Sequence, residues 1–286
     1  MDHHLEHQHW PTGTLYVVAT PIGNLADLTA RARYLLQHCD AVAAEDTRHT
    51  STLLNALGIS KPLLACHEHN EQQAAAKVIE RLQAQQRVAY ASDAGTPGIS
   101  DPGARLVQSV REAGFGIVPL PGVSAVTAAI SISGLVSHGF YFAGFLPSKK
   151  EARLHRLQAL AELDVPLVFY EAPHRVLECV SAMQEVWGGE RNIIIARELT
   201  KRFEEIHRCR LSQALAWLEA TPEHSKGEFV LVVEGKNKDT EHISAADKVL
   251  KPLLAALPTK QAVQLAAEIT GLGRNALYER ALSLKD

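Results

Sequence analysis

Ser92-Asp93-Ala94-Gly95-Thr96-Pro97-Gly98-Ile99-Ser100-Asp101-Pro102-Gly103 directly follows a short apolar segment at residues 87–91. The three glycines and two prolines in these twelve residues predict a fixed backbone that lies close to whatever it contacts. The apolar segment has the length and residue types of a buried strand. Because ligands bind at the carboxyl ends of strands in open parallel sheets, the stretch predicts a ligand-binding loop of an α/β fold. An ordinary tight turn is the alternative.

Similar apolar segments recur on both sides of this 92–103 loop. In the first part of the chain they are residues 15–19, 41–44, 62–65 and 116–120. Amphipathic stretches such as 70–84 lie between them. This alternation is expected for βαβ units on a mostly parallel sheet.

A second set of elements follows the small-residue helix predicted at 122–134. Strands are predicted at 140–146, 166–170, 192–196 and 228–234, with helices starting near Pro173 and at 211–219. A polar linker and three predicted helices end the chain near Leu284. We therefore expect a disordered tail (1–13), an N-terminal α/β domain (14–122), a second α/β domain with a mixed sheet (123–236) and a helical extension (237–286).

Polar or glycine-containing loops follow the other predicted strands as well, at residues 20–25, 45–50, 67–70 and 121–124. None matches a phosphate-binding signature. Gly98 and Gly103 have the glycine spacing of a P-loop, but Ala104 and Arg105 stand where Lys and Ser or Thr are required. The first loop lacks the G-x-G-x-x-G pattern of dinucleotide-binding folds. The loops therefore favour a flat ligand without a phosphate cradle.

Composition limits the remaining function classes. The chain has 286 residues, 29 basic and 32 acidic, with a net charge of −3, so a basic field over the whole surface is excluded and a polyanion would need a local patch. The four cysteines form no C-x-x-C pair, which favours reduced thiols. No apolar run reaches the ~18 residues of a membrane span, and the first ten residues lack a signal-peptide core. We expect a cytoplasmic protein.

Histidines suggest two metal sites, and we expect neither. The N-terminal tract of His3, His4, His7 and His9 is typical of a compositional tail. In His67-Glu68-His69 the two histidines lie on one side of a strand end, which is half of a zinc site. No third ligand with a suitable spacing follows.

Several strings carry a family resemblance when taken together. Residues 20–24, 44–50, 92–103 and 121–124 are joined, in order, by Gly144-Phe145-Leu146-Pro147, Phe169-Tyr170-Glu171, His174-Arg175, residues 196–201 and Lys226-Gly227-Glu228. In these strings the chain resembles the tetrapyrrole-methylase superfamily of S-adenosylmethionine-dependent methyltransferases, over about residues 14–235.

The resemblance implies two α/β domains with S-adenosylmethionine between them. It is closest to the branch that methylates the ribose 2′-hydroxyl of a cytidine in 16S ribosomal RNA of the small ribosomal subunit. Porphyrin-modifying members generally have a Gly-Asp-Pro turn where this chain has Ser92-Asp93-Ala94-Gly95. This departure favours RNA over a tetrapyrrole or another small molecule, which stays the alternative substrate.

The resemblance also implies which residues bind the cofactor. In the N-terminal half they are Pro21, Ser92, Asp93, Ala94, Gly95, Pro121, Gly122 and Ser124, and in the second half Tyr170, Arg197, Gly227 and Glu228. A sulfonium and ammonium cation without phosphate is suited to carbonyl, hydroxyl and carboxylate groups. Structural roles remain open for Asp93 as a turn cap and Tyr170 as a core aromatic.

An alcohol such as a ribose 2′-hydroxyl is a poor nucleophile, so transfer needs a general base or accurate in-line placement. Lys201 with Glu198 is our first candidate pair, provided that burial or nearby cations lower the pKa of Lys201. Asp46 with Arg48 is the second, although Asp46 is also a plausible N-cap of the helix starting at Thr47. Positioning alone is the third.

Three further hypotheses concern partners. The basic run Lys149, Lys150, Arg153, His155 and Arg156 is either a solvated face or a site of phosphate contacts. The family resemblance implies a homodimer. Gly271-Leu272-Gly273-Arg274-Asn275 between two predicted helices permits a helix-turn-helix, so a nucleic-acid-binding regulator is the alternative of another class.

Overall fold

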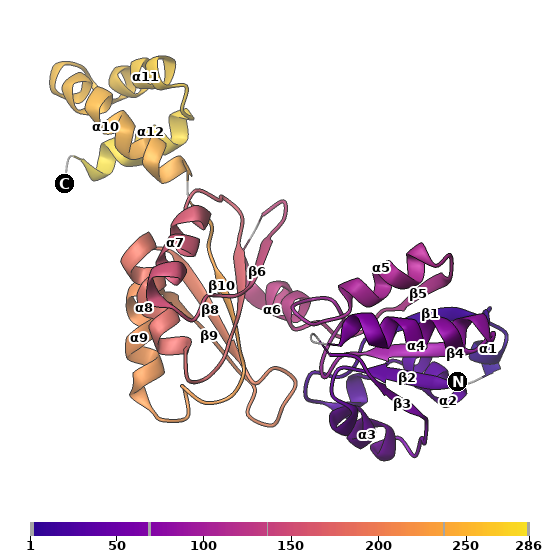
Figure 1. Ribbon diagram of the computed structural model, residues 1–286. Coiled ribbons are helices and arrows are strands. Elements are labelled where there is room, and N and C mark those ends of the chain that lie inside the picture. Colours follow the sequence, from indigo (N-terminus) through magenta and orange to yellow (C-terminus); the bar gives the residue numbers. More distant parts are fainter. Residues whose placement is uncertain (1–2, 68–69, 136, 237, 285–286) are drawn as a thin grey trace.

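The computed structural model describes residues 3–67, 70–135, 137–236 and 238–284. Within them the chain forms two five-stranded sheets and a C-terminal helical unit (Figure 1). The first sheet has the order β3-β2-β4-β1-β5 and is entirely parallel. Its strands are β1 (Thr14–Val18), β2 (Ala41–Ala44), β3 (Leu63–Ala65), β4 (Arg87–Ala91) and β5 (Gly116–Leu120). These bounds confirm the α/β fold and the five strands predicted for this part.

Helices cover both faces of the first sheet. α2 (Ala30–His38) and α3 (Thr47–Ala56) pack on one face, and α4 (Glu71–Gln83) and α5 (Ala104–Glu112) pack on the other. The central strands are therefore buried on both sides, which explains why they form continuous apolar runs in the sequence. A short 3₁₀ helix, Leu25–Asp27, follows the loop after β1.

The second sheet has the order β6-β7-β10-β8-β9, in which β6 and β7 are parallel and the other pairs are antiparallel. Its strands are β6 (Tyr141–Phe145), β7 (Leu167–Glu171), β8 (Asn192–Arg197), β9 (Glu205–Arg210) and β10 (Phe229–Val233). α7 (Lys150–Leu160), α8 (Val176–Trp187) and α9 (Leu211–Ala220) cover one face, and α6 (Ala125–Ser133) covers the other. The sequence did not predict β9, whose residues alternate between half-buried and exposed at the sheet edge.

The N-terminal segment differs from the disordered tail expected for residues 1–13. α1 (His3–Glu6) precedes Trp10, whose indole Nε1 donates to the carbonyl of Leu5 at 2.8 Å. Arg87 Nε donates to the carbonyl of Trp10 at 2.9 Å, and the Tyr16 hydroxyl donates to that of Pro11 at 2.8 Å. The expectation of disorder was wrong for this described part, because the Trp10 indole packs against the core between the first sheet and the helices α2 and α3.

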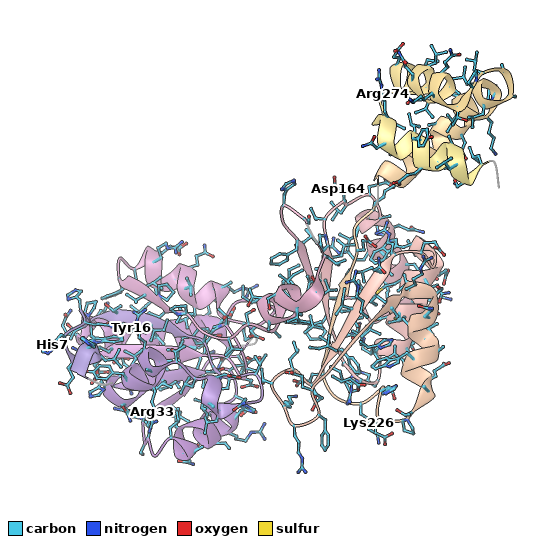
Figure 2. All side chains as sticks on the ribbon, turned by 180° about the vertical axis from the view of Figure 1, so that it is seen from behind. His7, Tyr16, Arg33, Asp164, Lys226 and Arg274 are labelled. Atoms are coloured by element: carbon cyan, nitrogen blue, oxygen red, sulfur yellow. The ribbon has the colours of Figure 1, made fainter. Side chains whose placement is uncertain are left out.

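The C-terminal unit consists of α10 (Lys238–Ala256), α11 (Thr259–Thr270) and α12 (Arg274–Ser283), which share a small apolar core. Arg274 lies in this unit, at the opposite end of the second sheet from Lys226 (Figure 2). We propose to divide the chain at 122/123 and 236/237, since α6 packs on the second sheet and α10–α12 have their own core. No helix among the described residues is long and apolar enough to cross a membrane.

Candidate active site

A cavity of about 380 Å³ lies between the loops at the carboxyl edge of the first sheet and the second sheet. Loops after β1 and β4 and the start of α6 line one side of it. The other side is formed by the ends of β6 and β7, the loop after β8 and the start of β10. The lining residues are Ile22, Ala94, Gly95, Thr96, Ile99, Asp101, Ser124, Ala125, Phe145, Tyr170, Glu171, Ala172, Pro173, Leu199, Glu228, Phe229 and Val230.

The charged side chains among the described lining residues are all acidic. Asp101, Glu171 and Glu228 contribute carboxylates, whereas no Lys, Arg or His occurs among the described residues that line the cavity. A phosphate group would meet repulsion there, and a cation would be stabilised. The cavity is therefore suited to a cationic ligand with apolar parts.

Backbone and side-chain contacts fix the 92–103 loop beside the cavity. Thr20 and Gly95 exchange two backbone hydrogen bonds of 2.8 and 3.0 Å, which join the loops after β1 and β4. At the far end, the Tyr90 hydroxyl donates to the carbonyl of Pro102 at 2.6 Å. Gly103 has φ +122, and a Cβ there would lie 2.6 Å from the Tyr90 hydroxyl oxygen. Only glycine fits this approach, so the loop has one defined conformation.

Asp46 caps a helix instead of facing the cavity. Its Oδ1 accepts from the backbone N–H of Arg48 at 2.8 Å, and its Oδ2 pairs with the Arg48 guanidinium at 2.6 Å. The hydrogen bonds from Arg48 hold the pKa of Asp46 well below its usual range. Asp93 supports this helix start, because its Oδ1 accepts from the backbone N–H of Asp46 at 3.1 Å. Asp46 does not line the cavity.

Lys201 and Glu198 form a network at the edge of the cavity with Glu228. Lys201 Nζ lies 2.9 Å from Glu198 Oε1 and 2.8 Å from Glu228 Oε2, and Glu198 Oε1 also accepts from the backbone N–H of Glu228 at 2.9 Å. Burial alone would lower the pKa of Lys201, but the two carboxylates outweigh it and raise that pKa. The condition for Lys201 as a general base is therefore not met. Its partners keep it charged.

Two glycines make room for this network. A Cβ on Gly23 would lie 2.4 Å from Lys201 Cγ, and a Cβ on Gly227 would lie 2.4 Å from Glu198 Cγ. Gly23 belongs to the loop after β1. The aliphatic part of the Lys201 side chain therefore packs directly on a loop of the first sheet. Glu198 itself has φ +53, a conformation that is rare outside glycine and is concentrated at functional sites.

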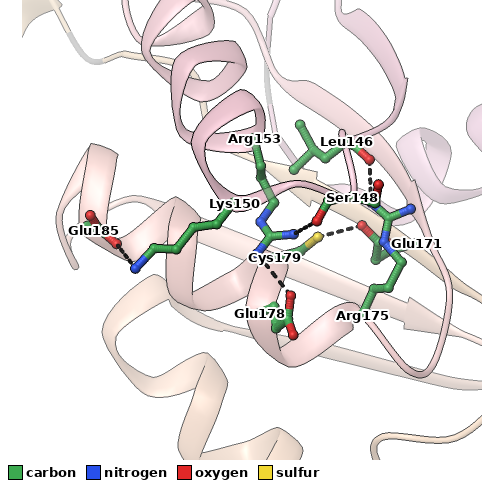
Figure 3. Close-up of polar contacts among 9 residues, drawn as sticks. All are labelled: Leu146, Ser148, Lys150, Arg153, Glu171, Arg175, Glu178, Cys179 and Glu185. Atoms are coloured by element: carbon green, nitrogen blue, oxygen red, sulfur yellow. Dashed lines mark hydrogen bonds and ion pairs between the residues drawn. The ribbon is translucent and has the colours of Figure 1, made fainter.

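Tyr170 and Glu171 reach the cavity from the end of β7. Burial raises the pKa of Tyr170, although hydrogen bonds with the Val126 backbone and the Ser124 side chain oppose this. Behind the cavity, Glu171 accepts from the Cys179 thiol at 2.5 Å and lies 3.3 Å from Arg175 Nε (Figure 3). Burial raises the pKa of Cys179 to about 12, so the thiol stays a hydrogen-bond donor.

Five of the residues predicted for the cofactor line the cavity: Ala94, Gly95, Ser124, Tyr170 and Glu228. The other seven are not part of the lining: Pro21, Ser92, Asp93, Pro121, Gly122, Arg197 and Gly227. Arg197, for example, is buried in β8 and pairs with Glu205 Oε2 at 2.9 Å.

Asp101 and Glu171 are cavity residues that sequence reasoning did not single out. The sequence held a signal for each of them, since Asp101 belongs to the 92–103 loop and Glu171 directly follows the strand predicted at 166–170.

The basic run around α7 is only partly available to a partner. Arg153 is 3% exposed, donates to the carbonyl of Ser148 at 3.1 Å and pairs with Glu178 at 3.0 Å (Figure 3). The hypothesis that Arg153 contacts phosphate is therefore corrected. Its side chain holds the start of α7 in place.

We expect Arg153→Ala to lower the free energy of unfolding by about 2 kcal/mol, because it leaves a cavity and a carbonyl without its donor. Urea unfolding measures this loss. The matched control is Lys150→Ala, since the Lys150 side chain is 71% exposed and its Glu185 partner lies 3.9 Å away. That control is expected to change stability by less than about 0.5 kcal/mol. Equal stability of the two variants would contradict a structural role for Arg153.

Comparisons with known proteins agree with this geometry. A family model described as tetrapyrrole (corrin/porphyrin) methylases matches residues 14–215. The chain belongs to this family. A second model, described as the RsmI C-terminal HTH domain, matches residues 240–285, which include most of α10 and all of α11 and α12.

Curated relatives cover nearly the whole chain. The chain is 50% identical to ribosomal RNA small subunit methyltransferase I of Pseudomonas aeruginosa, over 94% of this chain and 97% of the relative. It is 47% identical to the protein of that name in Pasteurella multocida, over 95% and 97%. For the Escherichia coli O157:H7 protein the identity is 48%, over 94% and 95%.

Solved structures support the fold. A cobalt precorrin-4 methyltransferase superposes with a TM-score of 0.59 at 17% identity, over 80% of this chain and 98% of that one. A uroporphyrin-III C-methyltransferase from Thermus thermophilus, complexed with S-adenyl homocysteine, has a TM-score of 0.54 at 18% identity, over 78% and 97%. These confirm the predicted two-domain tetrapyrrole-methylase-like fold.

The cavity also fits the cofactor of this family. S-adenosylmethionine carries a sulfonium and an ammonium group beside one carboxylate, and no phosphate, which agrees with a lining that has three carboxylates and no Lys, Arg or His. Two of these carboxylates have basic partners outside the lining, Glu171 with Arg175 and Glu228 with Lys201.

Ile22, Leu199 and Val230 give the lining apolar surface that would suit the uncharged parts of this ligand. Together with the family membership, this makes the chain an S-adenosylmethionine-dependent methyltransferase. No group of three metal-ligating side chains occurs among the described residues, and His69 of the histidine pair considered above lies outside them.

Proposed function

We propose that the protein transfers a methyl group from S-adenosylmethionine to the ribose 2′-hydroxyl of a cytidine in 16S ribosomal RNA, within the small ribosomal subunit. The carboxylate-lined cavity supports the methyl donor. The relatives of 47 and 50% identity support ribosomal RNA as the acceptor. The absence of the Gly-Asp-Pro turn at residues 92–95 speaks against a tetrapyrrole substrate.

The residues at the cavity have different roles in the proposed reaction. When bound, S-adenosylmethionine supplies an electrophilic methyl group. The Gly95 backbone and the Ser124 and Tyr170 side chains bind and orient it, and the carboxylates stabilise its positive charge. Lys201 remains protonated and, through Glu198 and Glu228, fixes the loop at the cavity edge. We propose Lys201 and Glu198 as positioning residues, and Asp46 as a support for the neighbouring helix.

The net charge of −3 excludes a basic field over the whole surface. The basic side chains that contact RNA must therefore be gathered in local patches. Lys149 and Lys150 remain candidates in the α7 run, and Arg156 pairs with the Tyr141 hydroxyl at 2.9 Å. In the loop after Lys201, Arg202 lies over the ring of the 66% exposed Phe203, an arrangement suited to stacking on an unpaired base. A homodimer, from the family resemblance, and a cytoplasmic location, from the composition of the sequence, complete the proposal.

The proposal is tested in cells with and without the gene. Mass mapping of methyl groups on 16S ribosomal RNA is expected to show one ribose-methylated cytidine that disappears with the gene and returns with a plasmid copy. Identical maps in the two strains would contradict the RNA substrate. Loss of a base methyl instead of a ribose methyl would leave RNA as the substrate and refute the 2′-hydroxyl as the acceptor.

A further inference from the structure

The loop between β8 and β9 (Figure 1) presents an aromatic side chain and a cation to solvent. Phe203 is 66% exposed, more than any other large apolar side chain among the described residues. The guanidinium carbon of Arg202 lies 5.7 Å from the centroid of the Phe203 ring, and no ion pair within the described part of the chain involves Arg202. Single exposed apolar side chains are common on protein surfaces. Phe203 differs from them in how its loop is held and in where the loop lies.

Hydrogen bonds give this loop a fixed conformation. The N–H of Lys201 donates to the carbonyl of Glu198 at 3.0 Å, and the N–H of Glu204 donates to the carbonyl of Lys201 at 3.1 Å. The N–H of Thr200 also donates to the Glu204 carboxylate at 2.5 Å. Thr200 has φ +68, a conformation that is rare for a β-branched residue and is concentrated at functional sites. A partner that binds Phe203 therefore does not have to order the loop first.

The loop also lies beside the cavity. Leu199 lines the cavity, and Phe203 follows four residues later, so their Cα atoms are at most about 14 Å apart. Thr200 Oγ1 lies 3.1 Å from where a Cβ on Gly23 would stand, so the loop touches the loop after β1 as well. Methyl transfer requires the acceptor ribose to reach this cavity. The Phe203 ring therefore lies within reach of the acceptor nucleotide and its neighbours on the strand.

We propose that Phe203 and Arg202 form a stacking platform for an unpaired base of the RNA substrate, next to the nucleotide whose ribose is methylated. The base lies on the face of the Phe203 ring, and the planar Arg202 guanidinium extends this surface and attracts a neighbouring phosphate. Every base has a flat π face, so the platform binds an unstacked base without reading its sequence. This inference rests on RNA as the substrate in the proposed function and adds residues that bind it.

Neither a paired strand nor a second protein suits this platform as well. In a helix the neighbouring bases already cover both faces of each base, which is why proteins stack aromatic side chains on unpaired bases. A protein surface that covered Phe203 would also obstruct the edge of the cavity, where the acceptor strand has to approach. A flexible single strand can lie on the ring and still bring its ribose to the cavity.

Binding to purified small ribosomal subunits tests the platform with the full chain. We expect Phe203→Ala to weaken the Kd for subunits about tenfold, which corresponds to the loss of one stacked base. Phe203→Leu should weaken it equally, because leucine is apolar but not flat, and Phe203→Trp should bind as tightly as wild type. The matched control is Phe140→Ala, since Phe140 is 42% exposed and precedes β6, whose opposite end, Phe145, lines the cavity. The control should bind subunits like wild type, and all variants should keep the wild-type Kd for S-adenosylhomocysteine.

Phe203→Trp also allows stacking to be observed by fluorescence. A base that stacks on the indole is expected to quench its emission. The probe is an unpaired oligocytidylate, and the comparison is the same oligonucleotide annealed to its complement. Wild type gives the background of Trp10, Trp187 and Trp217. We expect quenching beyond this background with the unpaired strand and none with the duplex.

Several results would overturn the inference. A wild-type Kd for subunits in Phe203→Ala would remove the ring from RNA binding. Normal binding by Phe203→Leu beside weak binding by Phe203→Ala would indicate an apolar contact without stacking. A changed oligomeric mass of Phe203→Ala in light scattering would place Phe203 between copies of the chain, and a weakened Kd for S-adenosylhomocysteine would make it part of the cofactor site. Quenching that is equal with the duplex, or absent with both probes, would exclude an unpaired base as the ligand.

These measurements do not require methyl transfer, so the two proposals can fail separately. If wild type binds subunits but transfers no methyl to ribose, the proposed function fails, and the Kd values and the quenching still decide on the platform. If wild type binds neither subunits nor the unpaired oligonucleotide, both proposals fail.

Discussion

Gly95→Val is expected to abolish the binding of S-adenosylhomocysteine, with a loss of affinity of more than about 100-fold. Gly95 has φ +78 and lines the cavity, and its Cβ would already lie 3.4 Å from Ile22 Cγ2. A branched side chain there strains the backbone and occupies ligand space. In wild type, ligand at 100 times its Kd should stabilise the fold by about 2.7 kcal/mol and so raise the Tm. ATP and NAD should not raise it.

The matched control for Gly95→Val is Gly114→Val. Gly114 has φ +82 and no atom within 4 Å of a built Cβ, and it lies outside the cavity lining. The control carries the same type of backbone strain and should keep the full melting shift with S-adenosylhomocysteine. A normal shift in Gly95→Val would remove the ligand from this cavity.

Lys201→Ala is expected to slow single-turnover transfer by about 10²-fold without removing a base. The substitution breaks two ion pairs and the packing on Gly23, so the loop that carries Glu198 loses its anchor. Glu198→Gln should have a smaller effect, about tenfold, because an amide oxygen can still accept from the Glu228 N–H. The measurement is the rate at saturating cofactor, with the Kd for S-adenosylhomocysteine measured in parallel.

The pH profile separates positioning by Lys201 from catalysis by Lys201. Because its pKa is raised from the ordinary lysine value, a lysine base would make the rate climb up to the alkaline limit of protein stability. We expect a flat profile above about pH 7 in wild type. A continued climb that is lost in Lys201→Ala would restore Lys201 as the base. Unchanged rates in both variants would remove Lys201 and Glu198 from the site.

Strands that form apolar runs were predictable from sequence, and the one described strand without such a run, β9, was not. The predicted bounds of β2, β4 and β5 are those observed. Burial on both faces explains the apolar runs of β2 and β4, and β5 is a mostly apolar run although it lies at the sheet edge. In β9, the residues Glu205, His207 and Arg208 give no such run, and only pairing with β8 makes it a strand. The cap at Asp46 was also predictable, since capping depends on local sequence.

The chemistry of single side chains depended on contacts that sequence distance hides. Lys201 has Arg197 and Arg202 nearby in sequence, which suggested a lowered pKa, but the fold brings Glu228 to 2.8 Å and reverses the direction. Arg153 belongs to a basic run yet is buried against Ser148 and Glu178. Asp101 was recognised as a cavity residue only when the fold showed what it lies beside.

The most direct measurement is methyl transfer in vitro from radiolabelled S-adenosylmethionine to purified small ribosomal subunits, followed by nucleoside analysis of the 16S ribosomal RNA. We predict that the label is found in 2′-O-methylcytidine with wild type and Gly114→Val and is absent with Gly95→Val. Label in a methylated base, or equal label with Gly95→Val, would contradict the account.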